Sequence, residues 1–352
     1  MKNASQLLLL LKQQHLIGDI ELNKAQEVSS PWYIKTLMGL CGWLAAIFIL
    51  GFIAAAMASI FDNPVALGIV GIALITGAYF LLVSSDSEFV EHLGLAVSLA
   101  GQSLVAFALF FNSAVDESFS WFILAIVQCI LAYLMPNYIH RMMSAYFATV
   151  SLSLFMMVMH LSSYYSAIVL LVVALLWLNE FTFSRHVRKL QAVGYGAVIG
   201  LIQFKTSILF ASGGTTWLEN SMPTVVPWLD EGLNILVMLY VLHHLVKHRK
   251  LVLAGEQKWF AIALLVLIGA GTLFANGIVC GILIMIIGFA IQNRVLLILG
   301  ILATLMNLSS YYYLLDISLL HKSFILAGLG GAGVLLAFIQ QRLSSQGEPH
   351  VE

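Results

Sequence analysis

The dominant pattern along this chain is a series of apolar segments of membrane-spanning length between residues 36 and 341. A hydrocarbon layer about 30 Å thick requires roughly 20 apolar residues for each helical crossing. Such segments occur at 36–61, 64–84, 89–111, 117–135, 138–160, 163–180, 187–211, 231–247, 258–275, 277–291, 294–313 and 318–340. The pattern therefore predicts an all-α polytopic membrane bundle of about twelve transmembrane helices.

The apolar segments divide the chain into three parts. Residues 1–34 read as a cytosolic N-terminal helical segment, residues 35–341 as the transmembrane bundle, and residues 342–352 as a short cytosolic tail. The first apolar run, Leu7 to Leu11, is followed directly by Lys12. Because this run is shorter than the core of a secretory signal, we do not expect a cleavable signal peptide.

Basic residues alternate between the two sides of the predicted bundle. With the N-terminus in the cytoplasm, only Lys205 and Lys322 fall on the outer side, and the remaining 14 of the 16 Lys and Arg fall on the inner side. Membrane proteins retain Lys and Arg in their cytosolic loops. An odd number of spans would disturb this alternation, so the pattern predicts that both termini are cytosolic.

Composition supports this interpretation and excludes other classes. The chain is 61% hydrophobic and only 9% charged, with a mean hydropathy of +0.97. These values are too apolar for the surface of a soluble domain. The net charge of −1 gives no sign of nucleic-acid binding. The cysteines, Cys41, Cys129 and Cys280, all lie in apolar segments, so we expect neither a disulfide framework nor a zinc site.

One short sequence occurs twice. Met159–Tyr165 reads MHLSSYY and Met306–Tyr312 reads MNLSSYY, at the outer ends of the fifth and eleventh predicted spans. This offset of six spans predicts a parallel repeat of two halves, at about 36–180 and 187–340. The alternative is a coincidence within a restricted alphabet, because the middle spans do not align at a constant offset.

The ionisable residues of the outer side form the first candidate site. Lys205 and Lys322 lie near outer helix ends, where each ammonium group can extend to the headgroups. Alternatively, they line an outer polar cluster with Asp316 and His160, in which Gln203 and Thr206 add hydrogen-bonding groups around Lys205. The external loop 212–230 and the outer helix ends also carry an acidic rim that includes Asp230 and Glu231, which we attribute to the confinement of lysine to the inner side.

Two amides form the second candidate site. Gln102 and Gln128 are the polar residues nearest the predicted midplane. Such amides commonly hydrogen-bond between transmembrane helices, and the alternative is a contact with a transported solute.

Other motifs indicate structure and not chemistry. Residues 328–333 match GxGxxG, but they lie within an apolar helix and lack the preceding strand that a dinucleotide site requires. Gly196 with Gly200 and Gly277 with Gly281 have the spacing of close helix packing. His244 and His248 have a metal-compatible spacing but no evident third ligand. We therefore predict no metal, no cofactor and no catalytic residue.

Two stretches resemble a known family. Residues 31–52, PWYIKTLMGLCGWLAAIFILGF, and residues 311–328, YYYLLDISLLHKSFILAG, resemble the bacterial membrane proteins grouped as domain of unknown function 4401, which are related to the 2157 group. The positions that match the motifs of this family are Trp32, Tyr33, Trp43, Tyr312, Asp316, Lys322 and Ser323. The resemblance implies a multi-pass protein of the bacterial inner membrane, often encoded beside a protein with a GDYXXLXY motif.

Three function classes follow from these observations. Proline-free spans, small-residue packing faces and few buried charges favour a membrane scaffold or anchor for a partner such as the GDYXXLXY protein. The span number and the repeat favour a secondary transporter or channel for a small solute. The third class is an outer-leaflet enzyme that uses Lys205, Asp316 and Lys322. We rank the scaffold first and the enzyme last.

Overall fold

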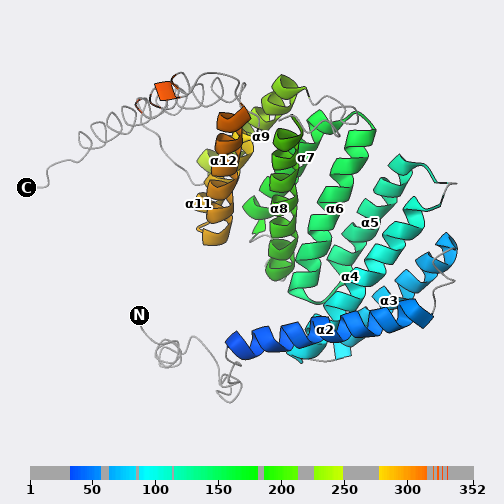
Figure 1. Ribbon diagram of the computed structural model, residues 1–352. Coiled ribbons are helices and arrows are strands. Elements are labelled where there is room, and N and C mark those ends of the chain that lie inside the picture. The colour runs from blue at the N-terminus through cyan, green and yellow to red at the C-terminus, as the bar shows by residue number, and fades with distance from the viewer. Residues whose placement is uncertain are drawn as a thin grey trace, which may run out of the picture. The chain divides into compact units, whose positions relative to one another are not determined.

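The computed structural model describes ten helices and, within the residues it describes, no strand (Figure 1). These residues are 32–56, 63–84, 87–112, 115–180, 186–212, 226–248 and 277–314, with the single positions 320, 323, 324, 327 and 331. The helices are α2 (Trp32–Ala56), α3 (Pro64–Ser84), α4 (Glu88–Phe110), α5 (Glu117–Leu134), α6 (Tyr138–Val158), α7 (Ser162–Leu178), α8 (Val187–Ser212), α9 (Pro227–His248), α11 (Ile278–Ala290) and α12 (Arg294–Leu314).

The predicted apolar segments correspond closely to these helices. The segment predicted at 64–84 is α3, and those at 117–135 and 294–313 agree with α5 and α12 to within one residue at each end. The start predicted at residue 231 is wrong, because α9 begins one turn earlier, at Pro227. Proline lacks an N–H and its fixed φ suits the first helical position, so it starts both α3 and α9. The segments 1–31, 258–275 and most of 318–340 lie outside the described residues.

Five of the described helices are long and apolar enough to cross a membrane. They are Pro64–Ser84, Glu88–Phe110, Glu117–Leu134, Tyr138–Val158 and Trp228–Lys247. Shorter apolar helices occupy Thr36–Phe52, Ser162–Leu178, Ile278–Ala290 and Arg294–Ser309. Large apolar side chains such as Phe48 and Phe52 are about three-quarters exposed. Exposed apolar side chains on helices of this length are consistent with a membrane protein, whose outer surface contacts lipid.

The chain forms two compact units. The first comprises residues 1–59 and 71–102 and contains α2 with most of α3 and α4. Here α2 packs closely on α4, because a Cβ atom at Gly42 would lie 2.8 Å from the Cβ of His92. Similarly, a Cβ at Gly101 of α4 would lie 2.9 Å from Cγ1 of Ile75 on α3. Glycine therefore sets the helix separations within this unit.

The second unit, residues 60–70 and 103–352, has its core around α7. Helix α7 contacts α6, α8, α9 and α11, and Tyr165, Leu170, Val173 and Trp177 on it are fully or almost fully buried. Tyr165 stacks edge-on against Phe204 of α8, and Trp177 against Tyr195, with ring centroids 4.3 and 5.0 Å apart. An apolar helix that is buried on most sides anchors its neighbours through packing alone.

Small residues bring the helices of the second unit into contact. A Cβ at Gly196 of α8 would lie 2.8 Å from the Cβ of Ala145 on α6. In the α11–α12 hairpin, a Cβ at Gly281 would lie 2.7 Å from the backbone nitrogen of Thr304. These contacts confirm that the glycine pairs at Gly196 and Gly281 serve close packing. Figure 1 shows α11 and α12 side by side as the result.

The basic residues at helix ends of the second unit gather at one end. Arg141 and Arg188 lie near the starts of α6 and α8, and the guanidinium of Arg188 lies 5.9 Å from the centre of the Tyr138 ring. The start of α12 lies at the same end, because the hydroxyl of Tyr195 on α8 donates to Oδ1 of Asn293, the residue before α12, at 2.9 Å. Lys205 lies toward the opposite end. The orientation of this end toward the cytoplasm stays a prediction.

The two copies of the repeated sequence differ in conformation. Met159 and His160 form the turn between α6 and α7, with a φ of +58° at His160, whereas residues 306–312 continue within α12. Asparagine and histidine are among the side chains that tolerate such a left-handed turn. The duplication of two six-span halves stays a prediction.

Candidate functional site

A cluster of charged and polar side chains is buried within the second unit, and we call it the polar cluster. It consists of Ser166 on α7, Lys205 on α8, Asp230, Glu231 and Asn234 on α9, Gly277 at the start of α11 and Asn307 on α12. Lys205 is 2% exposed, and Asp230, Glu231 and Asn234 are not exposed at all. Ionised groups are almost never buried so completely unless they are paired.

Lys205 is the centre of the polar cluster. Its Nζ donates to Oδ2 of Asp230 and lies 3.4 Å from Oε1 of Glu231. One ammonium group thus faces two carboxyl groups from consecutive residues. In an apolar interior, unpaired charges are costly, so this pairing is what allows all three side chains to remain there.

Neutral side chains complete the shell around Asp230. The Ser166 hydroxyl donates to Oδ1 of Asp230 and lies 3.1 Å from Oδ1 of Asn234. The amide nitrogen of Asn234 lies 3.4 Å from the same Asp230 oxygen, one helical turn along α9. Both oxygens of Asp230 therefore have partners, which the burial of a carboxylate requires.

Glu231 is less completely satisfied. Its Oε1 accepts a hydrogen bond from the backbone N–H of Gly277, but its Oε2 is buried and has no hydrogen-bond partner in the part of the chain that the structure describes. Asn307 lies on the other side of Gly277, where its Nδ2 donates to the Ala303 carbonyl at 2.8 Å and lies 3.4 Å from the Gly277 carbonyl. Its Oδ1 is also buried, with no hydrogen-bond partner among the described helices. Two side chains next to Gly277 therefore each have an acceptor oxygen for which the described residues supply no donor.

Helix geometry explains why acidic groups gather here. Helices α7, α9 and α11 begin at this end, so their partially positive N-termini face the cluster, and Asp230 lies in the first turn of α9. Lys205 lies seven residues before the end of α8 at Ser212, about 10 Å inside that helix end. The cluster is therefore about two turns deep and does not lie in a loop.

Gly277 has a conformation that its position requires. Its φ is +93°, which L-residues with a side chain rarely adopt. A Cβ here would also lie 2.8 Å from Cγ of Asn307. Glycine thus lets the chain enter α11 with its backbone N–H directed at Glu231.

Cys280 adjoins the polar cluster. It lies in the first turn of α11, three residues after Gly277, and is 3% exposed. Among the cysteines, Cys41 and Cys129 are exposed. A single buried thiol beside the cluster gives a natural reporter of its accessibility.

The two interpretations of Lys205 have different outcomes. Extension of its ammonium group to the headgroups is wrong, because the side chain is buried and bound to two carboxyl groups. Its proposed partners Asp316 and Lys322 lie outside the described residues. His160 is exposed at the α6–α7 turn.

The residues expected to surround Lys205 have other partners. The Tyr146 hydroxyl donates to Oε1 of Gln203, and the Thr206 hydroxyl donates to the Ile202 carbonyl at 2.8 Å. Both groups therefore serve packing of α8. Lys205 instead donates hydrogen bonds to carboxyl groups of α9, the helix whose start was predicted too late.

The predicted midplane amides are both buried. Gln102 is 5% exposed, and its Nε2 lies 3.3 Å from the Ser98 hydroxyl on the same helix. Gln128 is 3% exposed on α5. Neither belongs to the polar cluster, so their role as interhelical or solute contacts stays a prediction.

Sequence reasoning missed most of the polar cluster. Asp230 and Glu231 were assigned to an acidic rim, and Ser166, Asn234 and Asn307 were not singled out. Two signals were available. Pro227 marks a helix start that places Asp230 in the first turn, and Asn234 follows Asp230 at the i, i+4 spacing that puts both on one helix face.

The chemistry of the polar cluster favours small cations. Its ligands are carboxyl, amide and backbone oxygens, which suit hard cations and protons. Within the described helices, no group of three or more His, Cys, Asp and Glu side chains is arranged to hold a metal ion. Among the described residues, the cluster has one ammonium group for two carboxyl groups, so with all three ionised these side chains carry a net charge of −1.

Comparison with known proteins identifies a family. The family model described as domain of unknown function (DUF4401) matches residues 31–344, nearly the whole chain, and the chain belongs to this family. No curated protein and no solved structure matches it. The resemblance of residues 31–52 and 311–328 to this family is thereby confirmed.

Proposed function

We propose that this member of the DUF4401 family is a secondary transporter of the bacterial inner membrane, in which the polar cluster binds one exchangeable cation. The observation that carries the proposal is the carboxyl group of Glu231, which is buried and whose Oε2 has no hydrogen-bond partner among the described residues. A buried, uncompensated charge destabilises a membrane protein and is therefore usually retained for function. A proton or an alkali ion bound at Glu231 neutralises it.

The polar cluster changes the ranking of the functions. The scaffold was preferred because few charges were expected inside the bundle. Lys205, Asp230 and Glu231 now form such a buried group, whereas a scaffold needs only packing surfaces. The outer-leaflet enzyme is disfavoured, because Lys205 is enclosed and engaged with α9. The scaffold for a GDYXXLXY partner remains the second candidate.

The twelve-span threading with cytosolic termini is part of this proposal. Glu231 near the start of α9 contacts Gly277 at the start of α11, so both helices start at the same end of the unit. Two helices that start at the same end require the chain to return between them. The predicted crossing at 258–275 provides that return, and the five basic residues of α6, α8, α9 and α12 (Arg141, Arg188, Lys189, Lys247 and Arg294) then face the cytoplasm.

Transport requires that the polar cluster open to water during the cycle, and Cys280 tests this. With Cys41 and Cys129 replaced by serine, we expect a small membrane-impermeant thiol reagent to label Cys280 slowly in proteoliposomes, from one side. Cys280 is nearly fully buried, so labelling reports an opened state. If Glu231→Gln changes the rate of Cys280 labelling at least several-fold, the result supports a polar cluster whose charge state affects opening.

The scaffold predicts the opposite result. A closed, permanently packed cluster leaves Cys280 unlabelled in folded protein over hours, while unfolding in detergent exposes it fully. That outcome, together with loss of the chain from membranes when the neighbouring partner gene is deleted, would replace the transporter with the scaffold.

A further inference from the structure

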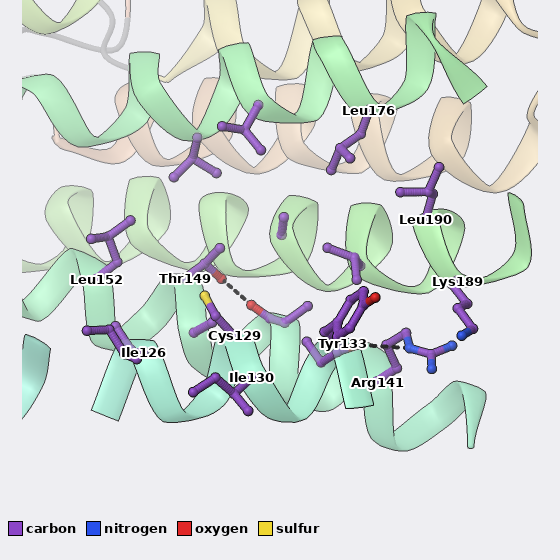
Figure 2. Close-up of a pocket in the computed structure, with 18 of the residues that line it drawn as sticks. Ile126, Cys129, Ile130, Tyr133, Arg141, Thr149, Leu152, Leu176, Lys189 and Leu190 are labelled. Carbon is purple, nitrogen blue, oxygen red and sulfur yellow. Dashed lines mark hydrogen bonds between the residues drawn. The ribbon is translucent and has the colours of Figure 1, made fainter. Parts of the chain in front are cut away.

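A groove on the second unit has the dimensions and charge pattern of a lipid-binding site. It has a volume of about 900 Å³ and is bounded by α5, α6, α7 and α8. Figure 2 shows Ile126, Cys129 and Ile130 along one side and Leu176 across from them. Most of the lining side chains are apolar, and the basic side chains gather at one end, whereas Thr149 lies beside Cys129 farther along the groove.

Small side chains create the groove. Ala145 and Ala148 of α6 and Ala197 of α8 line it, and all three are buried. The rim is formed by larger apolar residues that remain exposed, including Ile130 and Val172, which are 50% and 46% exposed. The described residues leave this apolar channel open, and an exposed apolar surface of this kind is suited to contact with lipid.

Arginine, histidine and lysine side chains occupy the end where α5 finishes and α6 and α8 begin. Arg141, His186 and Lys189 line the groove there, and Figure 2 shows Arg141 and Lys189 at the same end as Tyr133. His186 and Lys189 are exposed. Tyr133, 76% exposed, has the position of an interfacial aromatic ring.

Arg141 caps a helix and retains further N–H donors for a ligand. Its Nε donates to the Ala132 carbonyl at 2.8 Å, and one Nη donates to the Met135 carbonyl, so it caps the end of α5. A guanidinium group carries five N–H donors, and these two bonds leave others for an anionic ligand.

The length of the groove matches one bilayer leaflet. Its lining on α6 runs from Arg141 to Leu152, eleven residues, which corresponds to about 16 Å along a helix. Half of a hydrocarbon core is about 15 Å thick. The cationic end therefore lies at headgroup depth when the apolar part lies among the acyl chains.

We propose that this groove binds one anionic phospholipid, with its phosphate at Arg141 and Lys189 and an acyl chain along α6 and α7. Basic pockets between transmembrane helices on the cytoplasmic side recognise anionic headgroups in this way. Charge complementarity at one end and an apolar channel of one-leaflet length select a phospholipid over a helix of a protein partner, which does not require clustered cations. The proposal is independent of the polar cluster, which lies at the opposite end of these helices.

Native mass spectrometry of the delipidated full chain tests this proposal. We expect phosphatidylglycerol to bind as a single molecule, at least about five-fold more tightly than phosphatidylcholine with the same acyl chains. Lys189→Ala should weaken phosphatidylglycerol binding by about five-fold, since each cation near a headgroup contributes about that factor. Lys247→Ala is the matched control, because Lys247 is exposed at a helix end outside the groove, and it should have no effect.

A second pair of variants tests the apolar channel. Val172→Trp fills the groove and should reduce binding of both lipids, whereas Leu171→Trp, on the neighbouring exposed position outside the groove, should not. Equal affinity for the two lipids in the unaltered chain would overturn the proposal. Equal losses in Lys189→Ala and Lys247→Ala would do the same, since binding would then follow overall charge.

Discussion

Replacement of Lys205 by methionine is expected to lower the free energy of unfolding by about 3–5 kcal/mol. Methionine preserves much of the length of the side chain but removes the ammonium group, so Asp230 and Glu231 would face each other without a cation. Both carboxyl groups are fully buried, and water cannot replace the lost partner. Reversible unfolding in mixed micelles, followed by circular dichroism, measures the change.

Two further variants distinguish this explanation from general damage. Lys247→Met removes an exposed lysine from the end of α9 and should change stability by less than about 1 kcal/mol. Adding Asp230→Asn to Lys205→Met removes one of the stranded charges and should recover part of the loss. If Lys205→Met costs no more than Lys247→Met, the buried pairing of Lys205 with α9 is contradicted.

Replacement of Gly300 by alanine is expected to destabilise the α11–α12 hairpin by about 1–3 kcal/mol. A Cβ at this position would lie 2.7 Å from Cα of Met285 and even closer to its backbone nitrogen. Because the obstacle is backbone and not a flexible side chain, α11 must shift as a whole. The same unfolding measurement in micelles gives the loss.

Gly232→Ala is the matched control for Gly300→Ala. Gly232 lies in α9, beside Glu231, and a Cβ there would meet nothing within 4 Å. Alanine is the better helix former, so this variant should be neutral or more stable by up to about 1 kcal/mol. If both variants lower the free energy of unfolding equally, the loss is a general effect of replacing a helical glycine, and the explanation by the close α11–α12 contact is contradicted.

Run length and proline position explain why the helices were predictable. Each apolar segment must match the thickness of the hydrocarbon core, so its ends are visible in the sequence. The segment 64–84 shows this most clearly, since Pro64 begins α3 and Ser84 ends it. The start of α9 was placed too late because apolar length alone was considered and the start signal of Pro227 was not.

The polar cluster was less predictable because its members are distant in sequence. Lys205 pairs with Asp230 across 25 residues, and Glu231 reaches Gly277 across 46. A single sequence gives the faces of each helix but not which helix ends meet. Lys205 was identified as a candidate because a lysine inside an apolar segment is costly. Its actual partners depended on the packing of α9 against α8 and α7.

The lipid groove was likewise hidden from sequence reasoning. Its walls come from four helices, and its floor depends on alanines that look unremarkable in an apolar segment. The available signal in the sequence was the predicted cytosolic position of Arg141 and Lys189. This position indicates where a lipid headgroup would lie, but it does not reveal a channel between the helices. The groove and the polar cluster therefore give independent tests, at opposite ends of α8.

The most direct test of the central claim is the dependence of stability on cation concentration. We expect the melting temperature of the purified chain to rise with Na⁺ at constant pH, or with proton concentration at constant Na⁺, with choline chloride maintaining the ionic strength. A ligand at 100 times its dissociation constant stabilises the folded state by about 2.7 kcal/mol.

Glu231→Gln should abolish that dependence, because a neutral amide has no negative charge to balance. Glu180→Gln, at a buried glutamate that accepts from Gln191 outside the polar cluster, should retain it. The account predicts a cation response in the unaltered chain and in Glu180→Gln that is lost in Glu231→Gln. Identical responses in all three proteins would contradict a cation site at Glu231.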